Sequence, residues 1–179
     1  MNTSKTQKLV RIALMAAILC ILGPLSFPLP FSAVPVSLSI LGIFLAIVIL
    51  EPVDAVASIA LYILLGLVGL PVFSGFTGGV AKLFGPTGGY IIGYIPLVLI
   101  AWLFVKLFNR KIVFLCAGLI LGTLACYALG TTWLAISAGM TFKAALLAGV
   151  IPFIPFDIAK LAISVLIGLP VRKSLHSLL

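Results

Sequence analysis

Residues 76–90 read FTGGVAKLFGPTGGY, which places five glycines and one proline between two long apolar segments. Glycine and proline are the strongest breakers of regular secondary structure, so this stretch is predicted to be a loop. The apolar segments on both sides of it decide the fold. The loop itself raises the question of what so flexible a stretch does in a chain that is otherwise apolar.

The composition indicates a membrane protein. Of the 179 residues, 64% are hydrophobic and only 8% are charged, so polar surface is too scarce to cover a soluble globule. At roughly 20 residues for each transmembrane helix, the length allows about six spans joined by short turns. The sequence therefore predicts an all-α integral membrane protein that forms one domain, residues 1–179.

Apolar segments bounded by proline, glycine or charge predict where the six transmembrane helices lie. They are residues 9–24, 34–50, 55–70, 86–107, 112–139 and 145–171. The glycine-rich stretch falls in the loop between the third and fourth helices, residues 71–85.

The basic residues lie mostly at the ends of these spans and predict the topology. If both termini are cytoplasmic, eight basic residues face the cytoplasm, and only Lys82 and Lys143 lie outside. The eight are Lys5, Lys8, Arg11, Lys106, Arg110, Lys111, Arg172 and Lys173. Because cytoplasmic loops are enriched in Lys and Arg, we expect both termini inside and the 71–85 loop on the outer face, where it meets solutes from outside.

Several other classes of function find no support in the sequence. The net charge of +8 does not indicate a nucleic-acid partner, because the basic residues neither follow one helix face nor alternate with aromatic residues. No cytoplasmic segment is long enough for a nucleotide-binding domain, so any ATP chemistry would belong to another chain. The three cysteines lack CxxC spacing and there is a single histidine, so we expect neither a metal site nor a cofactor.

The glycine-rich loop is open to two interpretations. It is not a P-loop, because none of its glycines precedes a lysine. Gly85 and Gly89 have the spacing that lets transmembrane helices pack closely. Gly75, Gly78 and Gly79 instead favour a loop that folds back into the protein, because non-helical chain at membrane depth must line a cavity.

Asp157 and Lys160 form an acid–base pair in the otherwise apolar segment 152–160, PFIPFDIAK. Residues three apart project from one helix face. Pro152 and Pro155 predict that a helix restarts near Phe156, which puts the carboxylate in the first turn. Intramembrane charges usually pair and mark a substrate path, although a structural ion pair that fixes the helix is the alternative.

Four further residues each have two interpretations. Lys82 either attracts an anionic solute or simply faces water. Trp133 either stacks on a ligand or anchors the chain at the membrane interface. Ala13 and Ala17 form a small-residue face that packs on another helix, within this chain or in a partner.

The sequence from 69 to 94, GLPVFSGFTGGVAKLFGPTGGYIIGY, together with PFIPFDIAK, resembles the BioY family of biotin-specific substrate-binding subunits of energy-coupling factor (ECF) transporters. The resemblance extends over nearly the whole chain and includes VPVSLSILG at 34–42. The pattern FxGxxxGxxxLxGPTGGY is matched by Phe73, Gly75, Gly79, Leu83, Gly85, Pro86, Thr87, Gly88, Gly89 and Tyr90.

This resemblance implies a six-helix bundle that binds biotin at its outer face, beneath the 71–85 loop. It also implies a bacterial inner-membrane location and three partner chains, which are a membrane coupling (T) subunit and two ATPases. Ala13 and Ala17 would then dock on the coupling subunit. The chain itself would perform no covalent chemistry.

The resemblance also implies a set of biotin contacts. Asp157 would accept hydrogen bonds from the ureido N–H groups, and Lys160 would give charge-assisted hydrogen bonds. The lid would be formed by Thr77, Gly78 and Gly79, and the apolar walls by Tyr90 and Trp133.

The chain departs from the family pattern at three positions. Ser39 stands where many members carry glutamine, Thr77 where they carry asparagine in the lid, and Ile91 where some carry arginine. These differences leave open which residue holds the biotin carboxylate, and we hypothesise that Lys82 does so. Ser39 and Thr77 remain candidate contacts.

Two alternatives differ in ligand or in class. The same architecture could bind another vitamin, such as thiamine or riboflavin, but the combination of GPTGGY and DxxK favours biotin. An enzyme would need a nucleophile with a base, or a metal cluster, within the spans. A channel or autonomous carrier would need a polar stripe along several helices or repeated broken helices, and neither pattern is visible.

Overall fold

The computed structural model describes residues 5–30, 32 and 34–177, most of which are helical. The helices are α1 (Lys5–Leu22), α2 (Ser39–Ile49), α3 (Pro52–Leu67), α4 (Ala81–Phe84), α5 (Gly88–Leu107), α6 (Ile112–Ser137), α7 (Phe142–Gly149) and α8 (Ile154–Ser177). Two short antiparallel strands, β1 (Ser26–Phe27) and β2 (Val36–Ser37), lie between α1 and α2.

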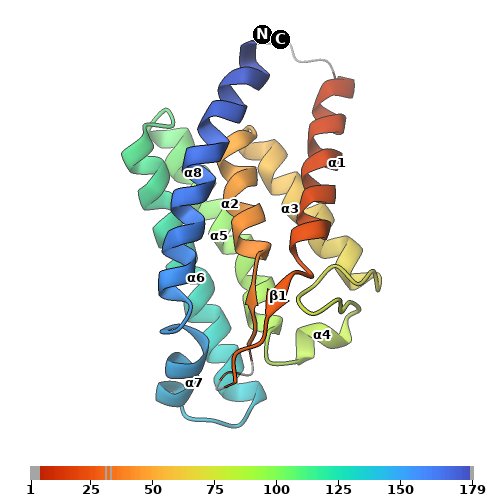
Figure 1. Cartoon of the computed structure of the whole chain (residues 1–179), viewed down its shortest axis with the longest axis vertical. Helices are drawn as coiled ribbons and strands as arrows, with labels where there is room; N and C mark the ends of the chain where they lie inside the picture. The colour runs from red at the N-terminus through yellow and green to blue at the C-terminus, as the bar shows by residue number, and fades with distance from the viewer. Residues whose placement is uncertain (1–4, 31, 33, 178–179) are drawn as a thin grey trace.

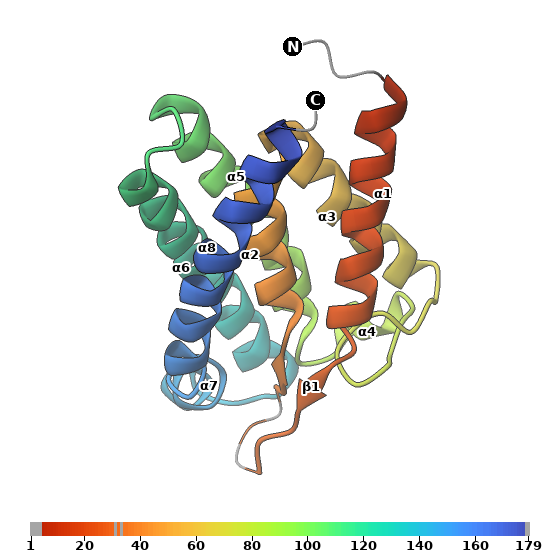
Figure 2. The same cartoon turned by 45° about the horizontal axis from the view of Figure 1, so that its top comes forward.

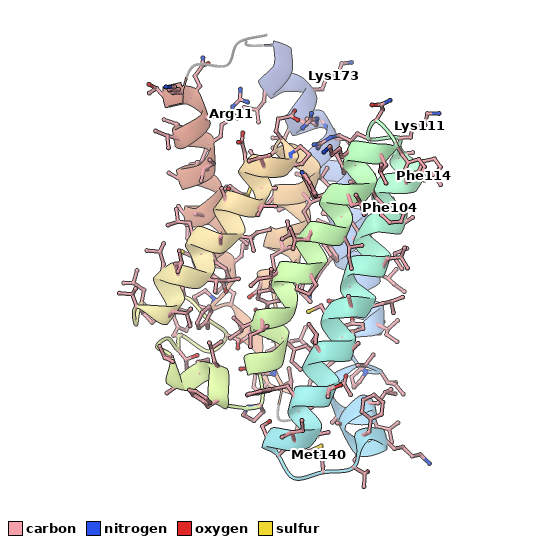
Figure 3. All side chains as sticks on the ribbon, turned by 180° about the vertical axis from the view of Figure 1, so that it is seen from behind. Arg11, Phe104, Lys111, Phe114, Met140 and Lys173 are labelled. Carbon is pink, nitrogen blue, oxygen red and sulfur yellow. The ribbon has the colours of Figure 1, made fainter. Side chains whose placement is uncertain are left out.

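The helices give the molecule two distinct ends. The start of α1, the α5–α6 turn and the end of α8 lie together (Figure 1), and Arg11, Lys111 and Lys173 are all at this basic end (Figure 3). The strands, α4 and α7 lie at the opposite end, as does Met140, and we call it the loop end. The shared position of the basic segments agrees with the predicted grouping of charges on one side.

Within the described residues, three helices are long and apolar enough to cross a membrane, which are α5, α6 and the 154–175 segment of α8. Helices α2 and α3 are apolar but shorter, with 11 and 16 residues. The chain is therefore a multi-pass helical membrane protein. A 16-residue helix rises about 24 Å, so α3 is shorter than a typical span.

Two of the predicted spans are wrong in their extent. The segment predicted as one helix over 145–171 is divided into α7 and α8, because Pro152 has no amide hydrogen to continue the first helix. The restart predicted near Phe156 occurs at Ile154, with Asp157 in the first turn. The predicted span 34–50 contains a strand before α2 begins at Ser39.

Helices α5 and α6 pack closely through small residues. A Cβ atom on Gly89 would lie 2.3 Å from Trp133 Cβ, and one on Gly93 would lie 2.8 Å from Cys126 Sγ. This confirms the predicted close packing at Gly89, whereas Gly85 has no such contact. Figure 2 shows the other main pairs, α1 beside α3 and α8 beside α2.

Two arginines close the C-terminal end of α2 at the basic end. Arg110, in the α5–α6 turn, donates to the carbonyls of Ile47, Val48 and Leu50 at 2.9–3.1 Å. Arg172, on α8, donates to the carbonyls of Ile49 and Leu50 at 2.9 and 3.1 Å and to Glu51 Oε1 at 2.6 Å. These carbonyls belong to the last turn, which has no partners within the helix. The arginines therefore join α2, α5, α6 and α8 at one point.

The charge on Arg110 persists in this position. Burial, followed by repulsion from Arg172, lowers the pKa of Arg110 to about 10. The guanidinium is still protonated at neutral pH, and it can hold its three acceptors.

We expect Arg110→Ala to destabilise the protein by about 1–3 kcal/mol, because carbonyls at the end of α2 lose their donors. Thermal unfolding in detergent measures this loss. Lys111→Ala is the matched control, since it removes the same charge from the exposed neighbouring residue. Equal unfolding temperatures for Arg110→Ala and the wild type would contradict the capping role.

Candidate functional site

Asp157 and Lys160 form a buried ion pair in the first turns of α8. Each residue is 6% exposed, and Lys160 Nζ lies 2.7 Å from Asp157 Oδ1. The carboxylate sits at the N-terminal end of the helix, where the helix dipole favours a negative charge. The structure thus confirms the pairing that the spacing predicted.

Tyr127 binds the second oxygen of this carboxylate. Its hydroxyl, on α6, donates to Asp157 Oδ2 at 2.5 Å. Both carboxylate oxygens of Asp157 therefore have a donor, one from α8 and one from α6. Sequence analysis missed Tyr127, although a tyrosine within the apolar segment 112–139 was a signal, because a buried hydroxyl there needs a polar partner.

An apolar cavity of about 280 Å³ borders Asp157 between α6 and α8. Its lining includes Phe44, Thr123, Tyr127, Val150, Asp157 and Leu161. The rim carries the exposed side chains of Ile120, Leu124 and Ile158. Since these residues face outward from the bundle, the cavity opens on the side of the molecule, where hydrocarbon would surround it.

A second, smaller cavity of about 40 Å³ lies at the loop end, among α2, α3, α5 and the 71–85 loop. Many of its walls carry hydroxyl groups, and we call it the hydroxyl cavity. Its polar lining consists of Ser37, Ser39, Tyr62, Ser74, Thr87, Tyr90 and Tyr94.

The 71–85 loop folds back on the end of α3. Phe73 and Thr77 exchange two backbone hydrogen bonds of 2.9 and 3.3 Å, and the Gly79 amide donates to the carbonyl of Gly66 at 2.7 Å. Gly79 has φ +87°, a conformation that L side chains rarely adopt. Gly78 has no room for a side chain, since a Cβ atom would lie 2.2 Å from the carbonyl oxygen of Leu70. The predicted fold-back is confirmed.

Thr77 and Ser39 are placed differently with respect to the hydroxyl cavity. Ser39, 1% exposed, lines the cavity and lies 2.8 Å from Ser37 Oγ and 3.4 Å from the Tyr62 hydroxyl. Thr77 uses its hydroxyl within the loop, where it donates to the carbonyl of Ser74 at 3.0 Å. In this arrangement Thr77 shapes the loop.

Tyr90 and Trp133 each donate a hydrogen bond to a backbone carbonyl of another segment. The Tyr90 hydroxyl donates to the carbonyl of Gly149 at 2.9 Å, while the residue lines the hydroxyl cavity. Trp133 Nε1 donates to the carbonyl of Gly85 at 3.0 Å, and its side chain packs on Gly89. Trp133 lines neither of the two cavities. Its observed contacts fasten α6 to the glycine-rich stretch.

Lys82 is half-buried on α4, away from the ion pair in sequence. Burial lowers the pKa of Lys82. Its ammonium is thus partly withdrawn from water within the 71–85 loop.

Ala13 and Ala17 lie on an outward face of α1, and both are exposed. They are surrounded by the exposed side chains of Leu9, Val10, Leu14 and Ile21. By contrast, Ala16 is 2% exposed and packs inward. The small-residue face is therefore not used for packing within the described part of this chain.

A polar pair and a hydroxyl-lined cavity, both enclosed by membrane helices, define a multi-pass membrane protein with an internal polar site. Residues 1–177 match the BioY family, and the chain belongs to it. It is 35% identical over 176 residues to the biotin transporter BioY2 of Lactococcus lactis subsp. cremoris, covering 98% of this chain and 95% of that one.

Two further comparisons agree with this assignment. The chain is 37% identical over 164 residues to a probable biotin transporter BioY of Pyrococcus horikoshii, covering 92% of this chain and 95% of that one. Its structure matches the crystal structure of the S component for biotin from an ECF-type ABC transporter with a TM-score of 0.89 at 30% identity. That match covers 97% of this chain and 94% of the other.

The ion pair can be tested for a purely structural role. Lys160→Met should cost about 3–5 kcal/mol, because it leaves the Asp157 carboxylate buried without its counter-charge. Adding Asp157→Leu should recover a large part of that loss, since an apolar pair needs no solvation. Thermal unfolding in detergent measures both.

The matched control for this cycle is Lys173→Met, which removes an exposed lysine from the same helix. If the double variant is no more stable than Lys160→Met, the ion pair itself holds α8 in place. Recovery means that folding does not require these charges.

Proposed function

We propose that this chain is the biotin-binding subunit of an ECF transporter, which captures extracellular biotin and presents it to an ATP-driven partner. The observation that carries this proposal is the BioY match over residues 1–177, together with a buried carboxylate–ammonium pair at the loop end. Family membership makes the chain a transporter subunit and not an enzyme. The relatives are named for biotin, which favours it over thiamine or riboflavin.

Asp157 has the capacity to hold the ureido ring of biotin. A carboxylate offers about four lone-pair positions, of which Lys160 and Tyr127 use two. Two positions remain for the ureido N–H groups. Lys160 supports this arrangement by pairing with the carboxylate and by offering further donors.

The hydroxyl cavity must widen to admit the ligand. Its volume of about 40 Å³ is far below the roughly 300–1,000 Å³ of typical small-molecule sites. The 71–85 loop forms one of its walls through Phe73 and Ser74, and two glycines in that loop, Gly75 and Gly79, have positive φ. We therefore propose that biotin enters at the outer face by displacement of this loop.

The membrane arrangement follows from the same proposal. Six spans, with both termini in the cytoplasm of a bacterial cell, would place the loop end outside and the basic end inside. A coupling (T) subunit and two ATPases would complete the transporter, with Ala13 and Ala17 on the docking face. The exposure of both alanines supports this docking role.

Calorimetric titration of biotin into the purified chain in nanodiscs tests the ligand. We expect nanomolar binding of biotin and no binding of thiamine or riboflavin. Asp157→Asn and Lys160→Ala should each weaken biotin by about 10-fold or more, as expected for a lost charged contact. Absence of biotin binding by folded, ligand-free protein would overturn the proposed function.

The same titration tests whether Lys82 contacts the biotin carboxylate. Lys82→Ala should weaken biotin more than biotin amide, because only biotin carries the negative charge. Lys143→Ala is the control, as it removes an exposed basic residue on α7, at the same loop end of the molecule (Figure 1). Equal losses for biotin and its amide would exclude this contact.

Docking is tested by enlarging the small-residue face of α1. Ala13→Trp and Ala17→Trp should weaken co-purification of the coupling subunit by about 10-fold or more, because close helix packing requires small side chains. Biotin binding should be retained. Ala60→Trp, an exposed alanine on α3, is the control, and undiminished association of both α1 variants would refute the docking face.

A further inference from the structure

Thr87 occupies the N-cap of α5, directly before Gly88. A threonine in this position commonly accepts a hydrogen bond from an amide of the first helical turn. The Thr87 side chain makes no such bond. Helix capping therefore does not account for this hydroxyl.

The Thr87 hydroxyl is also buried without a partner. The residue is 7% exposed, and Oγ1 has no hydrogen-bond partner among the residues that the structure describes. Such a group has lost its bonds to water and gained none in exchange, which is unfavourable. Thr131 Oγ1 on α6 is in the same condition but lines neither cavity, so the position of Thr87 decides what its hydroxyl can bind.

Thr87 lines the hydroxyl cavity, where three of its neighbours have already used their protons. Tyr62 donates to the carbonyl of Val72 at 3.1 Å, Ser37 to the carbonyl of Gly23 at 2.9 Å, and Tyr90 to the carbonyl of Gly149 at 2.9 Å. Their oxygens can still accept, but they have no second proton to give. Thr87 keeps its proton available to a group that enters the cavity.

The position of Thr87 is fixed by the close packing of the residues after it. A Cβ atom on Gly88 would lie 1.7 Å from the carbonyl oxygen of Leu83, and Gly89 packs against Trp133. Thr87 is thus held by the α5–α6 frame and needs little ordering when a ligand binds.

We infer that the Thr87 hydroxyl is a ligand contact that donates a hydrogen bond to a carbonyl oxygen in the head group of the bound molecule. The inference rests on the proposed function, and for biotin this atom is the ureido oxygen. The cavity of about 40 Å³ has room for roughly one water-sized group, so it is a subsite for that atom and not for the whole ligand.

Two substitutions at this position separate the hydroxyl from the shape of the side chain. Thr87→Val removes the hydroxyl at nearly constant size, and Thr87→Ser keeps it. The Val variant should bind biotin about 2- to 13-fold more weakly, the loss expected for one hydrogen bond, whereas the Ser variant retains most of the affinity. Thr131→Val makes the same change on α6, 1% exposed and outside both cavities, and should leave the affinity unchanged.

The unfolding temperature of the protein without ligand gives a second test that does not depend on biotin. Because the hydroxyl has no partner in the ligand-free protein, Thr87→Val should leave the unfolding temperature unchanged or raise it. Wild-type affinity in the Val variant, or a lowered unfolding temperature, would overturn the inference.

If the wild type binds no biotin, the proposed function is wrong. The unfolding temperature of Thr87→Val then tests the inference about the Thr87 hydroxyl without biotin. An unchanged or raised unfolding temperature then supports a free hydroxyl that serves a different ligand. A lowered one shows that the hydroxyl already has a partner within the protein.

Discussion

A carboxylate and an ammonium enclosed by membrane helices must find their partners inside the protein, because hydrocarbon offers none. Asp157 and Lys160 meet this constraint by pairing at 2.7 Å, and Tyr127 donates to the second oxygen of the carboxylate. Since Tyr127 belongs to α6, the same contacts join α6 to α8 beside a cavity that leaves these helices loosely packed. Replacing a buried ion pair by apolar side chains of similar volume is often neutral or stabilising, so packing alone does not require these charges.

The rest of the site combines a tightly packed frame with the 71–85 loop, whose only helix is the short α4. Helices α5 and α6 approach closely at Gly89 and Gly93, and this contact positions Thr87 and Tyr90 on one side of the hydroxyl cavity. Another wall comes from the 71–85 loop, whose amides at Gly79 and Gly75 donate to the carbonyls of Gly66 on α3 and of Pro24. Displacement of this loop, as proposed for ligand entry, would leave the hydrogen-bonding groups on the frame preorganised.

The sequence predicted the features that depend on local spacing. Asp157 and Lys160 could be paired because residues three apart share a helix face, and the helix restart could be located from Pro152 and Pro155. It did not predict Tyr127, whose partner lies 30 residues away, because nothing in local sequence brings α6 to α8. The hydroxyl cavity was missed for the same reason, since its walls come from three helices and a loop.

For Trp133, a long-range contact gives a role that the local sequence did not predict. Ligand stacking and interface anchoring were both reasonable from its apolar surroundings, yet its indole donates to the carbonyl of Gly85, 48 residues away. This bond holds the end of the 71–85 loop at the start of α5. The loop residues that the proposed ligand entry would displace therefore lie between α3 and Gly85. The proposed ligand entry at the loop end would therefore leave the contacts at the basic end unchanged. There, Arg110 and Arg172 keep four helices together.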